Sequence, residues 1–130
     1  MSLPAAKQGD QVLGFDTHLI QPFGPTSPVL VPMHPFSGII DGALSGDVSI
    51  EGRSAATVDS TATNTPPHLP LGGTFVNPPS NRAKIVKGST SVTINGKAAA
   101  RATDTAETCN DPRDLPVGTV VATSTVVIGG

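Results

Sequence analysis

Residues 91–100 read SVTINGKAAA, and related stretches occur at three other places in the chain. DVSIEGRSAA at residues 47–56 aligns with this stretch at an offset of 44, and TVVIGG at residues 125–130 aligns with its first half at an offset of 34. PAAKQGD at residues 4–10 aligns with AAARATD at residues 98–104. Self-similarity of this kind predicts a structure built from repeated small units.

The sequence of each unit predicts a strand, a tight turn and then a bend of small residues. We call this bend the repeat corner; it lies at residues 4–7, 54–57 and 98–101. Val92 and Ile94 are two positions apart and therefore lie on one face of a strand. Asn95 followed by Gly96 is a strong turn signal. A short apolar stretch precedes each of these strands, as Ile85-Val86 does here, and is the expected partner strand. The expected hairpins lie near residues 39–52, 84–96 and 119–130.

The composition favours a single all-β domain with long loops and a thin aliphatic core. The chain has 130 residues, of which 14 are Gly and 13 are Pro, with four Phe, no Trp and no Tyr. Gly and Pro are the poorest helix formers, and here they are spread along the whole chain. Burial of small aliphatic side chains recovers little free energy, so we expect a further stabilising element. Cys109 is the only cysteine, which excludes an intrachain disulfide and leaves a metal or a partner chain.

Net charge and targeting signals indicate which classes of partner and which compartment to expect. The net charge is −2, and the sequence shows neither a basic stripe nor an aromatic platform on which bases could stack, so we expect no nucleic acid partner. The first residues contain no apolar run typical of a signal peptide, and no later segment is apolar enough to span a membrane. We therefore expect synthesis in the cytoplasm without a signal peptide.

These motifs resemble the PAAR-repeat proteins, which are named for a Pro-Ala-Ala-Arg tetrapeptide. Residues 4–7 read PAAK and are followed by Asp10, and residues 98–101 read AAAR and are followed by Asp104. In a degenerate middle copy, residues 54–57 read SAAT and the acidic residue is displaced to Asp59. The resemblance covers one domain, residues 1–130, with repeat segments near residues 4–10, 39–60, 84–104 and 119–130 and loop insertions at 19–38 and 61–83.

The resemblance implies a small cone with approximate threefold symmetry, built of short β-hairpins with long loops and stapled by zinc near its apex. Such a tip caps and sharpens the trimeric β-helical spike of contractile injection machines, which include type VI secretion systems, extracellular injection particles and phage tails. The implied partners are one VgrG-like spike trimer per tip, the target membrane during passage and possible effector cargo. The protein would be assembled on the particle and delivered outside the cell or into a target cell.

Four residues form the full set of strong soft-metal ligands in this chain. Four is the number that a tetrahedral structural zinc requires. Three of them follow a repeat corner by five to nine residues, so each repeat would deliver one ligand to a shared axis. The fourth, His34, lies in the first insertion, outside the repeat phase. The candidate ligands of a single structural zinc are His18, His34, His68 and Cys109.

Two other functions remain open. A zinc-dependent hydrolytic effector needs an open coordination position and a general base. The chain has no H-E-x-x-H motif and no G-x-S-x-G elbow, and Glu107 is the one candidate base, so we expect no enzyme. A β-type adhesion module would normally present Tyr or Trp, and the chain has neither.

A spike-binding base is expected at the hairpins, because three separate hairpins leave unpaired backbone groups that invite sheet extension. One chain with three quasi-equivalent hairpins can match the three equivalent ends of a trimer. The expected base residues are Val48, Ile50, Val92, Ile94, Val126 and Ile128.

Overall fold

A computed structural model describes residues 2–130, and these residues form strands, turns and loops but no helix. No helix that could span a membrane occurs in this part of the chain. The strands are β1 (Leu3–Pro4), β2 (Gln11–Pro22), β3 (Val29–Gly42), β4 (Ser49–Ile50), β5 (Arg53–Ser54), β6 (Thr61–Asn64), β7 (Gly73–Phe75), β8 (Arg82–Ile85), β9 (Thr93–Ile94), β10 (Lys97–Ala98), β11 (Thr105–Thr108), β12 (Leu115–Val121) and β13 (Val127–Ile128).

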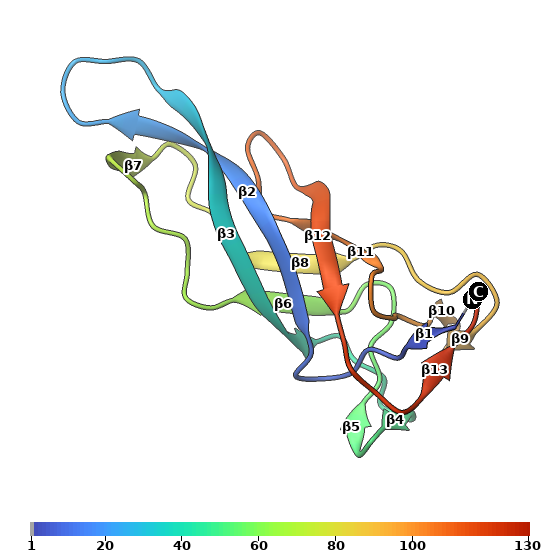
Figure 1. Cartoon of the computed structure of the whole chain (residues 1–130). Coiled ribbons are helices and arrows are strands. Elements are labelled where there is room, and N and C mark those ends of the chain that lie inside the picture. The colour runs from blue at the N-terminus through green and yellow to red at the C-terminus, as the bar shows by residue number, and fades with distance from the viewer. Residues whose placement is uncertain (1) are drawn as a thin grey trace.

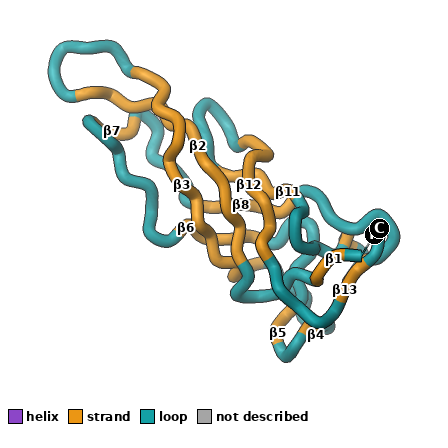
Figure 2. The backbone as a smooth tube through the Cα atoms, in the orientation of Figure 1, coloured by secondary structure: helices purple, strands orange, loops and turns teal. Residues whose placement is uncertain are grey.

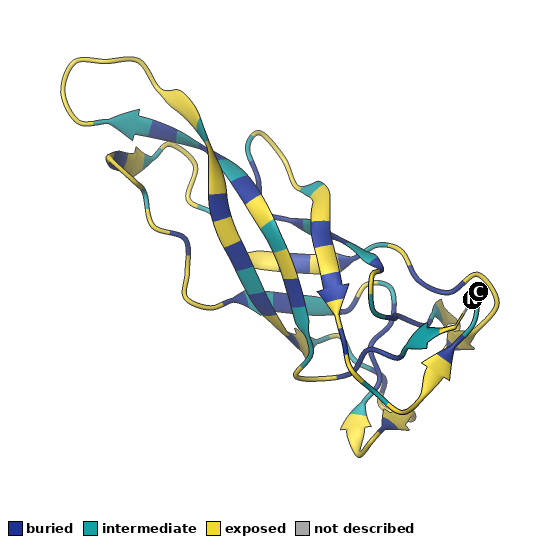
Figure 3. Cartoon of the chain, in the orientation of Figure 1, coloured by how far each residue is buried: buried dark blue, intermediate teal, exposed yellow. Residues whose placement is uncertain are grey.

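Six of the strands close into a small antiparallel barrel (Figure 1). The order is β2-β3-β6-β8-β11-β12, and β12 pairs back onto β2 through Val120 and Val12. Buried and exposed residues alternate along β2, β3 and β12, as Figure 3 shows. Phe36, Ile40 and Ile85 are the largest aliphatic and aromatic side chains of this core. The six-strand closure leaves the barrel interior small, which suits a chain whose core residues are mostly Ala, Val and Ile.

The β2–β3 hairpin is much longer than the barrel needs and projects well beyond it (Figure 1). Strand β7 pairs with the outer part of β2, from Ile20 to Pro22. Long loops surround these outer strands (Figure 2). We call this part of the molecule, residues 19–33 with 65–76, the distal end.

Three two-stranded sheets lie at the opposite end of the molecule, where the chain termini also meet (Figure 1). They are the hairpins β4–β5 and β9–β10 and the pair β13–β1, which joins the two ends of the chain, and we call them together the three-hairpin end. Asn95 and Gly96 form the β9–β10 turn, with φ of 53° and 79°, and Glu51 and Gly52 form the β4–β5 turn, with φ of 51° and 79°. The turn signals of the repeat therefore predicted the positions of these two turns, although the strands were expected to pair with the stretches upstream. One cluster joins the hairpins, and its members are Ala5, Ala55, Ala99, Ile50, Ile94 and Ile128.

The repeat corners meet on an approximate threefold axis between the hairpins and the barrel. Ala6 donates its backbone N–H to Ala100 O at 2.9 Å, Ala100 donates to Ala56 O at 3.0 Å, and Ala56 donates to Ala6 O at 3.0 Å. These three alanines are 0 to 1% exposed. A closed triangle of backbone hydrogen bonds brings three segments of the chain so close together that only small side chains fit between them.

The tight turn after each corner is held by a side chain three residues further on. Asp10 accepts the Lys7 N–H at 3.0 Å, and Asp104 accepts the Arg101 N–H at 2.8 Å. In the middle copy the acceptor is the Ser60 hydroxyl, which lies 3.0 Å from the Thr57 N. The assignment of Asp59 to this position was wrong, because a hydroxyl one residue later makes the same turn.

Two further expectations need correction. The Val-x-Ile strands pair with the residues that follow their turns, so β4 pairs with β5 and not with the upstream stretch Ile39-Ile40, which lies in β3. The insertion at 19–38 is mostly strand in β2 and β3, and the insertion at 61–83 contains β6, β7 and the start of β8. Buried residues alternate with less buried ones in the inner part of β3, from His34 to Ile40, and along β6 and β8, which suits barrel strands. The all-β class, the small cone-like shape and the repeated hairpins are confirmed.

Candidate metal centre

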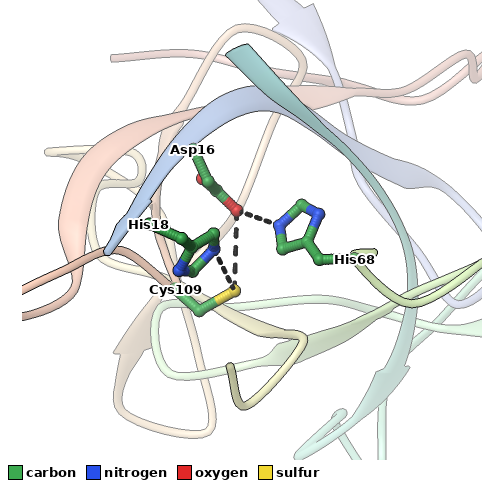
Figure 4. A group of neighbouring side chains, drawn as sticks. All are labelled: Asp16, His18, His68 and Cys109. Atoms are coloured by element: carbon green, nitrogen blue, oxygen red, sulfur yellow. Dashed lines mark hydrogen bonds and ion pairs between the residues drawn. The ribbon is translucent and has the colours of Figure 1, made fainter. Parts of the chain in front are cut away.

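Four buried side chains gather inside the barrel, toward the distal end (Figure 4). Each offers one metal-ligating atom, and these four atoms all lie within 4.8 Å of one another. Asp16 and His18 come from β2, His68 from the connection between β6 and β7, and Cys109 from the residue directly after β11. Three of the four predicted ligands therefore converge, from three connections that are far apart in the sequence.

The convergence follows from the repeat. Asp16 and His18 are two residues apart on β2 and face the barrel interior together, with 0% and 1% exposure. His68 is fixed by its own backbone N–H, which donates to Asn81 Oδ1 at 2.8 Å. Cys109 follows Thr108, whose hydroxyl donates to Asp16 Oδ1. Each ligand thus lies in the segment that follows one repeat corner.

The donor atoms face one another closely. Asp16 Oδ2 lies 2.7 Å from His68 Nε2 and 3.5 Å from Cys109 Sγ. Cys109 Sγ lies 4.0 Å from His18 Nε2. Carboxylate oxygen, imidazole nitrogen and thiolate sulfur are all ligands of zinc in proteins, and this set suits a first-row transition metal.

His34 lies beside the cluster but is not one of its four members. It is on β3, which pairs with β2, and its ring centroid lies 5.2 Å from that of His18 and 5.6 Å from that of His68. The residue is 2% exposed, and neither of its ring nitrogens has a hydrogen-bond partner among residues 2–130. Buried polar atoms without partners are costly, so an unpaired imidazole beside three other donors suits a site that binds an ion.

Asp16 was missed by reasoning from the sequence. The predicted ligands were the soft donors His and Cys, and Asp16 is a hard oxygen donor outside the Pro-Ala-Ala-Lys motif. A signal was nevertheless present, because the pattern Asp16-Thr17-His18 places a carboxylate and an imidazole on one face of the same strand. Glu107, the candidate general base, lies on β11 between buried Ala106 and Thr108 and therefore points to the other face of the sheet.

Burial sets the protonation of the thiol. Burial, followed by the charge of Asp16, raises the pKa of Cys109 to about 12. Burial and the neighbouring His68 lower the pKa of His18, and this effect is opposed by Asp111. The metal-free site at neutral pH therefore holds a neutral thiol and a neutral His18 ring, which is the form of imidazole that binds metal.

Metal uptake is expected to release about one proton per chain between pH 7 and 8, because only the thiolate binds metal. The apparent affinity should then rise about tenfold per pH unit, since the Cys109 pKa lies far above this range. Calorimetric titration with zinc in two buffers of different ionisation enthalpy measures the released protons. Cys109→Ser should abolish the release, and a proton count near zero for the native chain would contradict the thiolate ligand.

The three-hairpin end contains the six predicted base residues in two classes. Ile50, Ile94 and Ile128 are 4 to 8% exposed and form part of the cluster that joins the hairpins. The valine two positions before each isoleucine precedes the strand and is open to solvent, so the two do not share one face of a strand as expected: Val48, Val92 and Val126 are 36 to 43% exposed. Only the valines are available to a partner, because the isoleucines hold the hairpins together.

A comparison with models of protein families identifies the family of this chain. No curated protein matches the chain. A family model described as the PAAR motif matches residues 32–108, which is more than half of the chain, and this span includes the β4–β5 and β9–β10 hairpins. The chain therefore belongs to the PAAR motif family.

Proposed function

We propose that this protein is a structural tip that caps the trimeric β-helical spike of a contractile injection machine, with one tip per VgrG-like trimer. The PAAR motif suggests a spike-tip role in such systems. The observation that carries the proposal is the three-hairpin end, where three two-stranded sheets surround one approximate threefold axis. A single chain with this arrangement can meet three equivalent strands of a trimer.

The contact with the spike follows from the hairpins. Each is a two-stranded sheet with no third strand among residues 2–130, so backbone groups at its edges are free for sheet extension. Val48, Val92 and Val126 occupy equivalent places in the three units, and their neighbouring alanines pack on the axis. The shared geometry shows in three hydrogen bonds of 2.9 to 3.0 Å, from Ala55 N to Val48 O, from Ala99 N to Val92 O and from Ala5 N to Val126 O.

The opposite end has the properties of a surface that meets a membrane. Residues 17–40 and 60–81 contain no Asp, Glu, Lys or Arg, so every such residue of the chain lies outside the distal end. Phe23, Leu30 and Met33 of the long hairpin are 59 to 75% exposed, and Leu69 and Leu71 are 61 to 71% exposed. Charged groups are costly to carry into hydrocarbon, and residues 19–33 and 65–76 include none, while the Asp111 carboxylate lies at their margin, where it accepts the Leu19 N–H. With the three-hairpin end on the spike, the uncharged end faces the target membrane.

We further propose that the metal is zinc and that it serves as a structural staple. PAAR proteins are a structural family, and the candidate base Glu107 lies outside the cluster. When bound, the ion would add cross-links between β2, the β6–β7 connection and the end of β11. Delivery would occur with the particle, outside the cell or into a target cell, after synthesis in the cytoplasm. Effector cargo would attach through the exposed loops.

A charge placed on the three-hairpin end is expected to weaken spike binding at least tenfold. Val126→Glu introduces a carboxylate at a residue that is 43% exposed, so the fold should tolerate it while the contact with a partner strand does not. Binding to a purified VgrG-like spike trimer is measured by biolayer interferometry. Ile128 is unsuitable for this test, because it is 7% exposed and a charge there would disturb folding.

Val76→Glu is the matched control, because Val76 is 42% exposed and lies at the distal end. The proposal predicts unchanged spike affinity for this variant. Equal effects of the two substitutions, or no effect of Val126→Glu in a folded protein, would count against the three-hairpin end as the base.

A further inference from the structure

A pocket lies between β3 and the connection from β6 to β7. Its volume is about 380 Å³, which is within the range of small-molecule sites in proteins. Leu69 and Leu71 are 71% and 61% exposed and form its rim, whereas His34 and His68 are buried and form its inner wall. The apolar residues that line the pocket are Pro35, Pro66, Pro67, Leu69 and Leu71.

The polar groups in the wall of the pocket are directed into the protein. Ser37 donates its N–H to Asn64 Oδ1 at 2.8 Å, and its carbonyl accepts the Thr65 N–H at 3.0 Å. His68 Nδ1 lies 3.3 Å from Asn64 Nδ2, and both ring nitrogens of His34 are buried. An occupant of the pocket therefore meets mainly carbon atoms, and apolar surface is what drives its binding.

The wall formed by residues 65–68 is held in place before any ligand arrives. Two consecutive prolines, residues 66–67, have φ angles fixed by their rings. On one side of them the Thr65 N–H is bonded to Ser37, and on the other the His68 N–H donates to Asn81 Oδ1 at 2.8 Å. Binding therefore does not have to order this segment, which lowers the entropic cost of taking up a ligand.

The class of occupant follows from the charge around the pocket. None of the lining residues is Lys, Arg, Asp or Glu, so the lining supplies no partner for a charged group. Protein partners meet a polar rim and make roughly one hydrogen bond per 100 to 200 Å². A hydrocarbon chain needs neither. The rim leucines also belong to the uncharged distal end, whose other exposed side chains include Phe23 and Leu30.

We propose that this pocket takes up one acyl chain of a lipid from the target membrane, without recognition of the headgroup. The inference rests on the proposed function, in which the three-hairpin end binds the spike and the distal end meets the membrane. An acyl chain that leaves the bilayer for this pocket exchanges one apolar environment for another, so little apolar surface becomes exposed to water. Lipid packing is thereby loosened at the point where the tip enters.

The test uses the full chain and single-chain amphiphiles below the concentration at which they form micelles. n-Alkyl phosphocholines of increasing length are titrated by calorimetry, and n-alkyl maltosides repeat the series with an uncharged headgroup. We expect one molecule per protein and an affinity that rises about fourfold per methylene until the pocket is filled, with both headgroups alike. A strong dependence on the headgroup, or no saturable binding at any chain length, would overturn the proposal.

Leu71→Asp is expected to weaken the binding of dodecyl phosphocholine at least tenfold, because it places a carboxylate on the rim of the pocket. Leu30→Asp is the matched control. Leu30 is 59% exposed and lies at the distal end, but it does not line the pocket, so this variant should keep the native affinity. Equal losses in the two variants would mean adsorption to the apolar surface and would contradict a defined pocket.

Two further measurements separate this proposal from its alternatives. Light scattering on the free protein should show a monomer, and a dimer that Leu71→Asp dissociates would make a second copy of the chain the occupant. Both variants should bind the spike with native affinity, because they lie at the opposite end from the hairpins. Failure of the native chain to bind amphiphiles while it still binds the spike would count against the pocket alone, whereas failure to bind the spike would count against the proposed function.

Discussion

Removal of the metal is expected to lower the free energy of unfolding by about 4 kcal/mol or more when free zinc stands a thousandfold above its Kd. For a chain of this size that loss corresponds to a fall in melting temperature of roughly 10 to 25 °C. The physical reason is that the cluster joins β2, the β6–β7 connection and the end of β11, which no disulfide links. Thermal unfolding followed by circular dichroism, with and without a chelator, measures the change.

Cys109→Ser is the control for the chelator. It removes the one thiolate, so its melting temperature should be low and should not fall further when chelator is added. Ser is close to Cys in size, and the buried site should therefore lose its metal without gaining a large cavity. A native protein whose melting temperature is unaffected by chelator would show that the fold does not depend on the ion.

Ala56→Leu is expected to destabilise the protein by about 3 kcal/mol or more, which is at or above the upper range for an overpacked core. Ala56 is 1% exposed and belongs to the triangle of backbone hydrogen bonds with Ala6 and Ala100. A longer side chain must push the three corners apart, which weakens these hydrogen bonds as well as the packing. Urea unfolding in the presence of excess zinc measures the loss.

Ser49→Leu is the matched control, because Ser49 is close to Ala in size but lies exposed on β4. The added side chain there meets solvent, so we expect a change within about 0.5 kcal/mol. Equal stability of Ala56→Leu and the native protein would mean that the axis has room for larger residues, and would contradict the close packing of the three corners.

The predictions that succeeded came from local patterns. Alternation of Val and Ile with polar residues predicted the strands, and Asn95-Gly96 predicted a turn that the structure contains. The spacing of His18, His68 and Cys109 from their repeat corners predicted that these side chains would meet, and they do. Each of these signals depends on a few neighbouring residues, or on the phase of a repeat, and both are visible in one sequence.

The predictions that failed concerned the choice of partner. Ile39-Ile40 has the composition of a hairpin strand, yet it lies in β3 and pairs with β2 and β6. Asp59 was the nearest acid to the middle corner, but the Ser60 hydroxyl makes the turn. In each case the local sequence allowed more than one partner, whether a strand for Ile39-Ile40 or a turn acceptor for Thr57. The folded structure selected one of them.

The sequence by itself determined the all-β class, the repeated turns, the small residues at the corners and three members of the buried cluster that could hold a metal ion, because periodicity, turn chemistry and residue type are local properties. Only the tertiary structure decided that six strands close into a barrel, that Asp16 joins the cluster and that His34 lies beside it. These outcomes depend on the register between β2 and β3 and on contacts between segments up to about ninety residues apart, such as Asp16 with Cys109. Such contacts are set by the total packing of the chain, which no single segment encodes.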